Sequence, residues 1–411
     1  MDWADTAEQA LFREEVREFI RERFPAAYTP DLRGAENSEP DDVPGYNWPA
    51  DRRSEDSQRS AAAAEWARTL AEKRWVAPHW PTEYGGAGLS SLEHFILTEE
   101  MARARVPTVG GIGVTLLGPT LIEFGTEEQK REHLPRTVSG DVVWAQAFSE
   151  PEAGSDLASL TTRAERDGEH YVINGQKIWT SHAQYADWVF VLVRTSPDAP
   201  KHRGITFLMM DISTPGIEVR PIVDMAGETP FNEIFFDNVQ VPVSNRVGEE
   251  DRGWYVAMAT LDFERSGVGV AVADMLAIEE LVALSQDGDG QAWLRPDWDD
   301  SIRHEIAERY IELRVLFNLA LRTAHSQDTG QPPGYEASVS KLFGSEVHQR
   351  VAQTRLKALG QMGNVWRGHH APLDGRYARD YLNSISHTIL SGSSEILRNV
   401  IATRGLGLPR K

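Results

Sequence analysis

The chain of 411 residues contains no cysteine. This absence excludes disulfide bonds, thiolate metal ligands and a cysteine nucleophile. The chain also lacks any apolar run near the roughly 18 residues that a membrane span requires. Its first residues, MDWADTAEQA, are acidic and polar, which is unlike a signal peptide. We therefore predict a cytoplasmic protein that has no membrane contact and no metal site.

Positive charge is scarce as well. The 42 Lys and Arg residues face 62 Asp and Glu residues, so the formal net charge is −20. Such a charge repels nucleic acid and anionic membranes, and neither is an expected partner. A substrate with phosphate groups therefore has to be met by local positive groups. The hydrophobic share of 41% is that of an ordinary globular protein with room for two or three packed units.

The spacing of apolar residues changes twice along the chain. Helical spacing in the first part predicts helices at residues 6–23, 61–73, 91–105 and 127–137. From Val142 the spacing approaches two, which predicts strands at residues 188–194, 205–212, 217–221 and 232–241. After Gly253 the helical spacing returns, with helices predicted at residues 301–327, 337–360 and 395–403.

Two segments between these regular elements give further local predictions. The stretch from Tyr28 to Ser60 is rich in Pro and charged residues, and predicts an exposed surface loop. The pair Asn174-Gly175 separates two strand-forming runs, 171–173 and 176–178, and predicts a tight hairpin turn.

The whole pattern predicts an α+β protein with three domains. We expect an N-terminal helical domain at residues 1–140, a central β domain at 141–248 and a C-terminal helical domain at 249–411. The pattern by itself does not fix the topology of these domains.

Two segments near the middle of the chain suggest chemistry. The first, QAFSEPEAGSD at residues 146–156, offers hydroxyls and a glycine in a polar loop, which suits close approach to a phosphate-bearing cofactor. The second, QKIWTSH at residues 176–182, places the flat ring of Trp179 beside the hydroxyls of Thr180 and Ser181. This combination suits a planar redox ring, although both segments also fit ordinary loop and core roles.

At these two segments the sequence resembles the acyl-CoA dehydrogenase family of flavoproteins, and the resemblance extends from about Ala10 to the C-terminus. It implies an N-terminal helical domain, a β-barrel-like central domain and a C-terminal four-helix bundle. It also implies FAD as the cofactor, an acyl-CoA as the substrate and an electron-transfer flavoprotein as the electron acceptor. The cofactor contacts that it implies come from Gln146, Phe148, Ser149, Ser155, Trp179, Thr180, Ser181, Ser393 and Glu395.

Desaturation of an acyl thioester needs a base for the proton next to the carbonyl. Glu264, in the run LDFER, interrupts an apolar helical stripe formed by Ala257, Leu261, Val268 and Ala271. Burial there would raise its pKa toward that of a general base. By pattern alone, a buried glutamate paired with an arginine is the favoured interpretation. The resemblance favours catalysis, because a minority of the family, similar to isovaleryl-CoA dehydrogenase, carries its base on a helix in such a motif.

Most of the family carries the base in a later loop, directly before a glycine. Here that position is Ser391, followed by Gly392, and serine cannot act as the base. The rival carboxylate is Glu395, which at the third position of a helix would cap backbone amides. The resemblance places Ser155, Asp262, Arg265 and Gly392 near the acyl-CoA, although Asp262 and Arg265 also fit a simple ion pair on a helix. It further implies that a backbone amide near Ser391 polarises the thioester oxygen.

The chain departs from the family pattern at two elements through which subunits usually reach a neighbour's cofactor. The Arg-x-x-Phe-Gly element is missing from residues 286–298, and Lys357 occupies the place of a glutamine before a glycine pair that is broken here. Heteromeric relatives from bacterial steroid side-chain degradation share this departure, and residues 230–253 resemble them. We therefore expect a homologous partner subunit in a heterotetramer, with a homo-oligomer as the alternative.

Three other functions stay open at this stage. The chain could be a non-catalytic subunit that completes a partner's flavin site, an oxidase that uses oxygen, or a flavoprotein for a small substrate without CoA. The intact Glu264 and Trp179 segments argue against the first of these. The sequence does not identify the acyl group, and straight, branched and polycyclic groups are all compatible with it.

Overall fold

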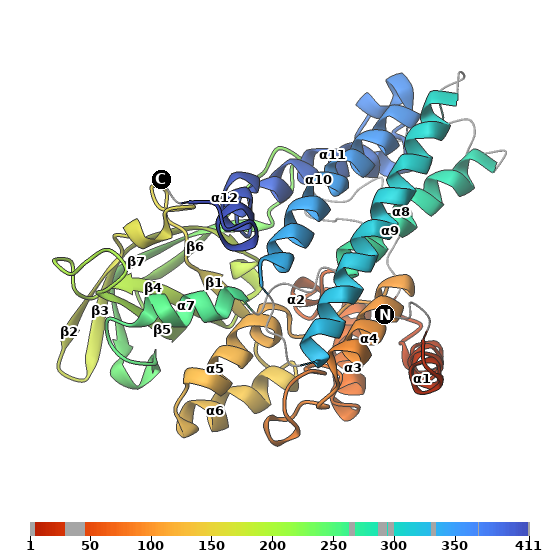
Figure 1. The fold of residues 1–411 in the computed structure, drawn as a ribbon. Coiled ribbons are helices and arrows are strands. Elements are labelled where there is room, and N and C mark those ends of the chain that lie inside the picture. Colours follow the sequence, from red (N-terminus) through yellow and green to blue (C-terminus); the bar gives the residue numbers. More distant parts are fainter. Residues whose placement is uncertain are drawn as a thin grey trace.

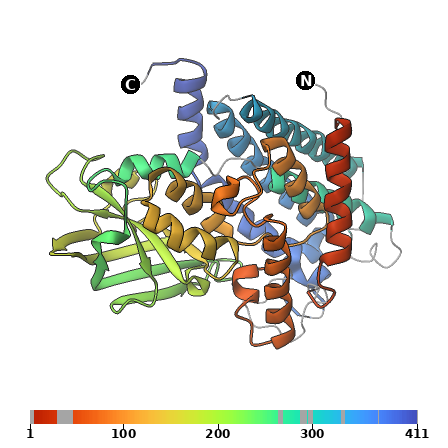
Figure 2. The same ribbon diagram turned by 90° about the horizontal axis from the view of Figure 1, so that it is seen from below.

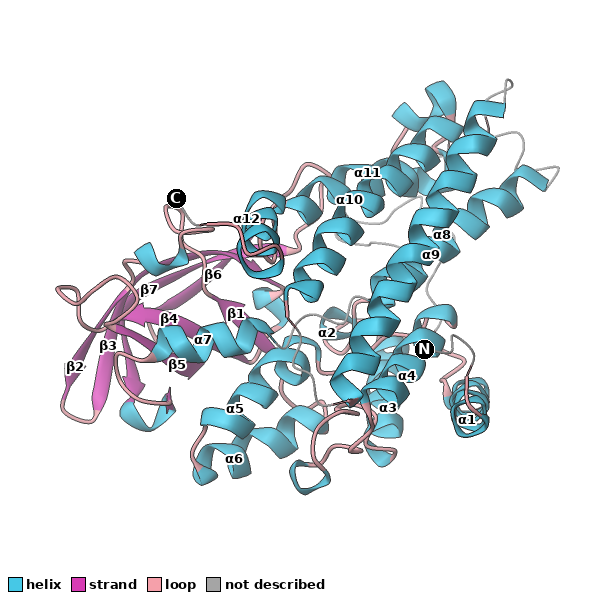
Figure 3. Ribbon diagram, in the orientation of Figure 1, coloured by secondary structure: helices cyan, strands magenta, loops and turns pink. Residues whose placement is uncertain are grey.

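A computed structural model describes residues 5–28, 46–262, 268–286, 294, 300–329, 334–368 and 370–409. The chain forms a helical region, then a sheet, then a second helical region, as Figure 1 and Figure 3 show. This order confirms the predicted α+β fold and its three-part architecture. Among the described residues, no helix has both the length and the apolar character of a membrane span.

The N-terminal helices begin at polar caps. Thr6, Ser90 and Thr126 each accept a backbone N–H of the following turn, while a Gln or Glu side chain returns a bond to the cap residue. The helices of this region are α1 (Ala7–Arg23), α2 (Trp48–Asp51), α3 (Ser57–Glu72), α4 (Ser91–Arg103), α5 (Gly118–Phe124) and α6 (Glu127–Val138). A π-turn, η2 (Gly113–Leu117), leads directly into α5.

The predicted surface loop from Tyr28 to Ser60 is wrong for its described part. Tyr28 and Trp48 are buried, and the Tyr28 hydroxyl donates to Asp51 Oδ2 at 2.8 Å. Arg59 Nε donates to the same carboxylate at 2.7 Å. The aromatic and apolar residues of this stretch are too few to give a period, but they anchor it to the domain. Helix α3 also begins before the predicted start, because Asp56 caps it.

The central region is one sheet of eight strands. Along the main path the order is β6-β7-β3-β2-β4-β5-β8, and β1 pairs with β4 in parallel. The strands are β1 (Trp144–Ala147), β2 (Arg163–Asp167), β3 (His170–Ser181), β4 (Trp188–Arg194), β5 (Ile205–Asp211), β6 (Ile217–Ile222), β7 (Phe231–Pro242) and β8 (Arg246–Val247). Strand β4 is apolar throughout its middle because it is covered on both faces.

The predicted hairpin at Asn174-Gly175 is wrong, because β3 continues through both residues. The pair instead forms an irregularity in the ladder between β3 and β7. Gly175 has φ 151°, and a Cβ there would lie 2.7 Å from Thr162 Cα. The glycine is therefore needed for close approach of Thr162, and not for a reversal of the chain. The reversal occurs earlier, where Asp167 pairs with His170.

The C-terminal helices form the second helical region, seen beside the sheet in Figure 2. They are α7 (Gly253–Asp262), α8 (Val268–Gln286), α9 (Asp300–Asp328), α10 (Tyr335–Ala358), α11 (Arg376–Ser384) and α12 (Ser394–Val400), with the short turn η9 (Ile385–Thr388) before α12. Helix α7 packs on β5, whereas α8, α9 and α10 pack on one another. Helix α4 joins this bundle, since Phe95 contacts Phe317 with ring centroids 5.2 Å apart.

Candidate cofactor and substrate site

The most unusual side chain in the sheet is Trp179. Its backbone has φ 61°, in the left-handed region that bulky residues avoid, and it lies at an irregularity of the β3–β7 ladder. The kink turns the indole out of the sheet, where it is 56% exposed and touches Phe231 edge to face at 5.9 Å. A large exposed ring on a strained backbone indicates a binding surface.

Buried polar atoms without partners gather around this kink. Gln146 Nε2 on β1, Thr180 Oγ1 on β3 and His182 Nδ1 just after β3 have no hydrogen-bond partner among the described residues. Asn232 Oδ1, on the neighbouring strand β7, is also buried and has no hydrogen-bond partner among the described residues. An unpaired buried polar atom costs roughly 1–3 kcal/mol. Several of them close together indicate a ligand with complementary polar edges.

A buried ion pair shapes the loop that follows β1. Lys177 Nζ, on β3 and 0% exposed, donates to Glu150 Oε1 at 2.8 Å and to the carbonyl oxygen of Phe148 at 3.1 Å. The Glu150 carboxylate also accepts the backbone amides of Thr161 at 2.6 Å and Thr162 at 2.9 Å. The pair thereby fixes both ends of the segment 148–162.

Both members of this pair are charged at neutral pH. Burial alone would raise the pKa of Glu150, but the Lys177 charge and the donated hydrogen bonds outweigh it and lower the pKa to about 2. Burial lowers the pKa of Lys177 to about 8, although Glu150 opposes the shift. Since 8 lies above neutral pH, Lys177 keeps its proton.

The predicted residues of this loop have different environments. Phe148 is buried between Phe190 and Phe207, so its ring belongs to the core of the sheet. Ser149 is half-buried, and its carbonyl oxygen accepts the Ile178 amide at 3.0 Å, which joins the two predicted segments. Ser155 is exposed and directly precedes Asp156, which forms an ion pair with Lys201.

The start of α12 carries the other predicted cofactor contacts. Ser393 caps the helix by accepting the Ile396 amide at 3.4 Å, and Ser394 Oγ is buried without a partner among the described residues. Glu395 is exposed at the second position of α12, one residue earlier in the helix than predicted. Its own backbone amide and the Ser393 hydroxyl lower the pKa of Glu395, which fits the capping interpretation.

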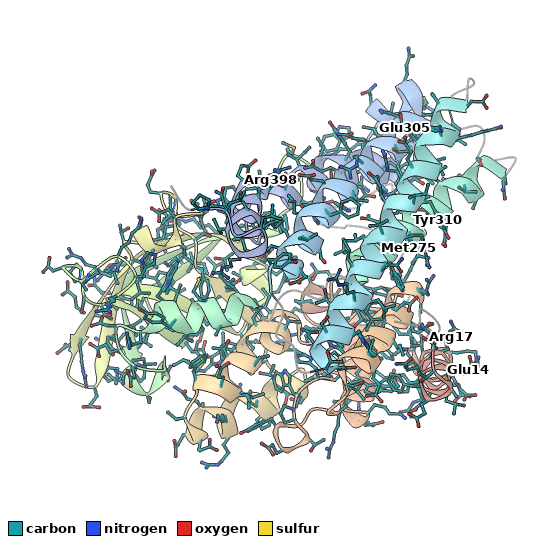
Figure 4. The ribbon with its side chains drawn as sticks, viewed as in Figure 1. Glu14, Arg17, Met275, Glu305, Tyr310 and Arg398 are labelled. Carbon is teal, nitrogen blue, oxygen red and sulfur yellow. The ribbon has the colours of Figure 1, made fainter. Side chains whose placement is uncertain are left out.

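A groove of about 380 Å³ lies beside this helix start. Its walls come from α10, η9 and α12, and include Thr388, Ser394, Glu395 and Arg398. Arg398 is labelled on α12 in Figure 4, at the side of the bundle that faces the sheet. Ser391 and Gly392, just before the cap, both have left-handed backbones, with φ 52° and φ 93°.

Glu264 and Arg265 lie outside the described residues, and Asp262 is the last residue of α7. The flanking residues are held firmly on both sides. Thr260 Oγ1 lies 2.8 Å from Thr120 Oγ1 of α5, and helix α8, which begins at Val268, packs on α4.

The predicted apolar stripe beside Glu264 is buried at Ala257, Val268 and Ala271 and half-buried at Leu261. The segment between α7 and α8 is therefore bracketed by contacts with α5 and α4.

Three family models cover most of the chain. The acyl-CoA dehydrogenase N-terminal domain matches residues 49–141, the middle domain matches 145–239 and the C-terminal domain matches 251–406. The chain is also 40% identical to acyl-CoA dehydrogenase IpdE1 of Mycobacterium tuberculosis, over 84% of this chain and 88% of that protein. This chain belongs to the acyl-CoA dehydrogenase family.

Solved structures agree with this assignment. The structure described as "Tcur3481-Tcur3483 steroid ACAD" superposes with a TM-score of 0.83 at 33% identity, covering 100% of both chains. The ChsE4-ChsE5 complex from Mycobacterium tuberculosis gives 0.81 at 33% identity, again covering 100% of both. The predicted family is thus confirmed, and the chain is an acyl-CoA dehydrogenase, an oxidoreductase acting on CH–CH bonds, from a family of flavoproteins.

The residues around Trp179 fit a flavin by their own chemistry. A flavin ring has a flat face for the exposed indole and an edge of carbonyl and ring-nitrogen groups for Gln146 Nε2 and Thr180 Oγ1, which have no partner among the described residues. Ser394 Oγ offers a further hydrogen bond from the start of α12.

Sequence reasoning missed four residues of this acyl-CoA dehydrogenase. His182 and Asn232 carry buried polar atoms without partners among the described residues, and Glu150 with Lys177 fixes the loop. His182, Glu150 and Lys177 lie inside the two segments discussed in the sequence analysis, and this location could have indicated a role at the site. Asn232 is 0% exposed and gave no signal, because its burial depends on the ladder with β3.

Proposed function

We propose that this chain catalyses the FAD-dependent α,β-dehydrogenation of an acyl-CoA thioester. In this proposal Glu264 removes the α proton, and FAD, when bound, supplies N5 as the acceptor of the β hydride. The two electrons then pass to an electron-transfer flavoprotein. The observation that carries the proposal is the exposed Trp179 on its left-handed kink, beside the buried Gln146 and Thr180 atoms that have no partner among the described residues.

The chain's own residues have distinct parts in this reaction. Trp179, Thr180 and Gln146 hold the flavin from the sheet side, while Ser393 and Glu395 approach it from α12. Gly392 and Arg265 lie on the acyl-CoA side, and Asp262 next to the base. This division is supported by the left-handed backbone before α12 and by the buried neighbours of Glu264 on α7 and α8.

The CoA phosphates need positive charge, because the whole chain is strongly acidic. Ser155 is exposed and directly precedes Asp156, whose carboxylate pairs with Lys201, a positive group near this loop. We assign Ser155 to the phosphate-bearing part of the cofactor or substrate. The acyl group is tested with butyryl-CoA, isovaleryl-CoA, octanoyl-CoA and cholyl-CoA, since one solved relative is described as a steroid enzyme.

The decisive experiment replaces the base. Glu264→Gln should keep its flavin but lose roughly 10²–10⁴-fold in the rate of anaerobic flavin bleaching by the active acyl-CoA. Glu127→Gln is the matched control, because that side chain is exposed at the start of α6 and has no part in the proposed site, and it should leave the rate unchanged. An unchanged rate in Glu264→Gln refutes the base. If no acyl-CoA of the panel bleaches the flavin of the wild type, the substrate class is wrong.

The electron acceptor is tested separately. Turnover should require electron-transfer flavoprotein, and oxygen should reoxidise the reduced protein slowly. Rapid formation of peroxide in air without a carrier would instead identify an oxidase.

A second candidate is a half-site subunit that relies on a homologous partner. Lys357, where relatives place a glutamine that reaches a neighbour's cofactor, is bound to Glu305 Oε1 at 3.0 Å. Figure 4 places Glu305 on α9, toward the outer end of the bundle. A lysine held by its own chain's carboxylate is poorly placed to serve a neighbour. The observation favours a heteromeric assembly, as in the ChsE4-ChsE5 complex.

Native mass spectrometry tests this candidate. Expressed alone, the chain should carry little flavin, and co-expression with a neighbouring homologous gene should restore flavin and produce a mixed oligomer. The Lys357→Gln variant should still need the partner for flavin binding, because the Arg-x-x-Phe-Gly element that reaches a neighbour's cofactor is missing as well. A pure homo-oligomer with one flavin per chain would contradict the half-site proposal while leaving the dehydrogenase proposal intact.

A further inference from the structure

A polar cluster with a buried carboxylate joins three elements of the C-terminal bundle. Asp274 on α8 is 5% exposed and receives a hydrogen bond from His348 Nδ1 of α10 at 2.8 Å. The His348 ring lies against the ring of His387 in η9, with centroids 4.2 Å apart. Among the described residues, no group of three such side chains has the arrangement of a metal site. The cluster therefore needs another explanation.

The same face of α10 holds the segment after His387. Lys341 Nζ donates to the carbonyl oxygens of His387 at 2.9 Å and of Gly392 at 2.8 Å, so one ammonium group closes both ends of the segment 387–392. Gln349 Nε2 adds a bond to Thr388 Oγ1 at 3.1 Å.

Within this segment Ser391 has φ 52°, which costs a non-glycine residue roughly 1–2 kcal/mol. Such a conformation persists only where the surroundings enforce it. The contacts from α10 supply that constraint.

The charges around the cluster favour an ion pair between Asp274 and His348, beside a neutral His387. Burial would lower the pKa of His348, but its hydrogen bond to Asp274 and the charges of Asp274 and Asp380 raise it, against a smaller opposing effect of Arg355. Burial, then the charge of His348 and that of Lys341, lower the pKa of His387 to about 4, although Asp274 opposes the shift. His387 is thus neutral at physiological pH.

Stability alone does not account for this arrangement. A buried ion pair can often be replaced by apolar residues of similar volume without loss, because its desolvation cost offsets its attraction. Asp274 Oδ2 also has no partner among the described residues, so the cluster leaves part of its hydrogen-bonding capacity unused. What the cluster does achieve is a fixed position for η9 and the segment that leads to Ser391 and Gly392.

We propose that Lys341, His348, His387 and Asp274 are positioning residues that hold the segment 388–392 so that a backbone amide near Ser391 meets the thioester oxygen of the acyl-CoA. The proposal rests on the proposed dehydrogenase function. None of the four residues is a base or a nucleophile in this scheme. They act by fixing the position of the backbone amide that stabilises the negative charge developing on the thioester oxygen.

The test uses the flavin-loaded protein, assembled with its partner if one is required. Lys341→Met should lower the single-turnover rate of flavin bleaching by about 10²-fold, the effect of a misplacement near 1 Å. The Kd of the acyl-CoA should change little, since the segment receives charge mainly in the transition state. Lys341→Arg should recover much of the rate. Lys73→Met, which breaks an exposed ion pair with Glu15, is the matched control.

A pH profile separates positioning from mere folding. The raised pKa of His348 means that its ion pair is complete below the ordinary value near 6.5 and is lost as the pH rises through the raised value. The rate ratio between wild type and His348→Gln should therefore be largest at low pH and should shrink as the pH rises. A ratio that does not vary with pH contradicts the role of the pair.

Two results overturn the proposal. One is an unchanged bleaching rate in Lys341→Met. The other is a loss of rate in which acyl-CoA affinity and thermal stability fall equally and Lys341→Arg does not recover the rate, since that pattern describes a structural residue. Failure of the proposed dehydrogenase function gives a different result, because in that case no acyl-CoA of the panel bleaches the flavin of the wild-type protein.

Discussion

The ion pair of Lys177 and Glu150 gives the sharpest test of how the central loop is held. Lys177→Met removes the ammonium group but keeps most of the apolar stem, and leaves a buried carboxylate without its counter-charge. Breaking one side of a buried pair costs about 3–5 kcal/mol. With unfolding entropy near 2.1 cal/mol/K per residue, a loss of about 4 kcal/mol over 411 residues lowers Tm by about 5 °C if the chain unfolds as one unit.

The assay is a set of four proteins in urea or thermal unfolding. Wild type, Lys177→Met, Glu150→Gln and the double variant form a cycle, and the double variant should be more stable than the sum of the single losses predicts. The coupling should reach about 2 kcal/mol or more, because both side chains are buried. Lys73→Met is again the control, since exposed pairs contribute about 0–1 kcal/mol.

The pH dependence of the same pair has a definite sign. The pKa of Glu150 falls from an ordinary value of 4.5 to about 2, so its contribution is complete above 4.5 and is lost as the pH falls toward 2. The difference in unfolding free energy between wild type and Glu150→Gln should shrink across that interval. A coupling below about 0.5 kcal/mol, together with no acid-dependent difference, would falsify the argument that this pair holds the loop.

Two further predictions concern single residues. Trp179→Ala should weaken flavin binding by up to about tenfold, since an aromatic contact contributes about 0.5–1.5 kcal/mol; Trp179→Phe should retain most of the affinity, and flavin titration measures both. Thermal stability should hardly change, because the ring is largely exposed. Gly118→Ala should destabilise the chain by about 1–3 kcal/mol or more, because its Cβ would lie 1.7 Å from the Trp80 ring. Gly154→Ala meets no atom within 4 Å and is the control in the same unfolding assay, where equal Tm values for the two variants would contradict the packing argument.

The sequence predicted those parts of the fold that depend on periodic burial. Strand β4 and the helices of the bundle follow from the spacing of apolar residues, which reports a buried face directly. The prediction of a hairpin at Asn174-Gly175 was wrong because a glycine at this position can permit the close approach of another segment as well as a turn. Only the position of Thr162, distant in sequence, decides between the two.

The motifs of the candidate site are visible in the sequence, but the contacts that hold them in place are not. The segments with Ser149 and Trp179 were visible as motifs, and the carbonyl oxygen of Ser149 does bind the Ile178 amide beside Trp179. By contrast, the pairing of Asp274 with His348 joins two helices whose relative rotation no local pattern specifies. Side chains that act through tertiary contacts leave no period in the sequence.

The kink in β3 connects the stability of the sheet with the presentation of the cofactor site. Lys177 points inward and holds the loop after β1, Trp179 is turned outward by its left-handed backbone, and Thr180 is buried again. A regular strand would place Lys177 and Trp179 on the same face, because side chains alternate. The irregularity between Lys177 and Thr180 therefore lets one short stretch anchor the loop from inside and offer a flat ring outside. Because Lys177 lies two residues before Trp179 on the same strand, weakening its ion pair with Glu150 should loosen both the loop and the indole.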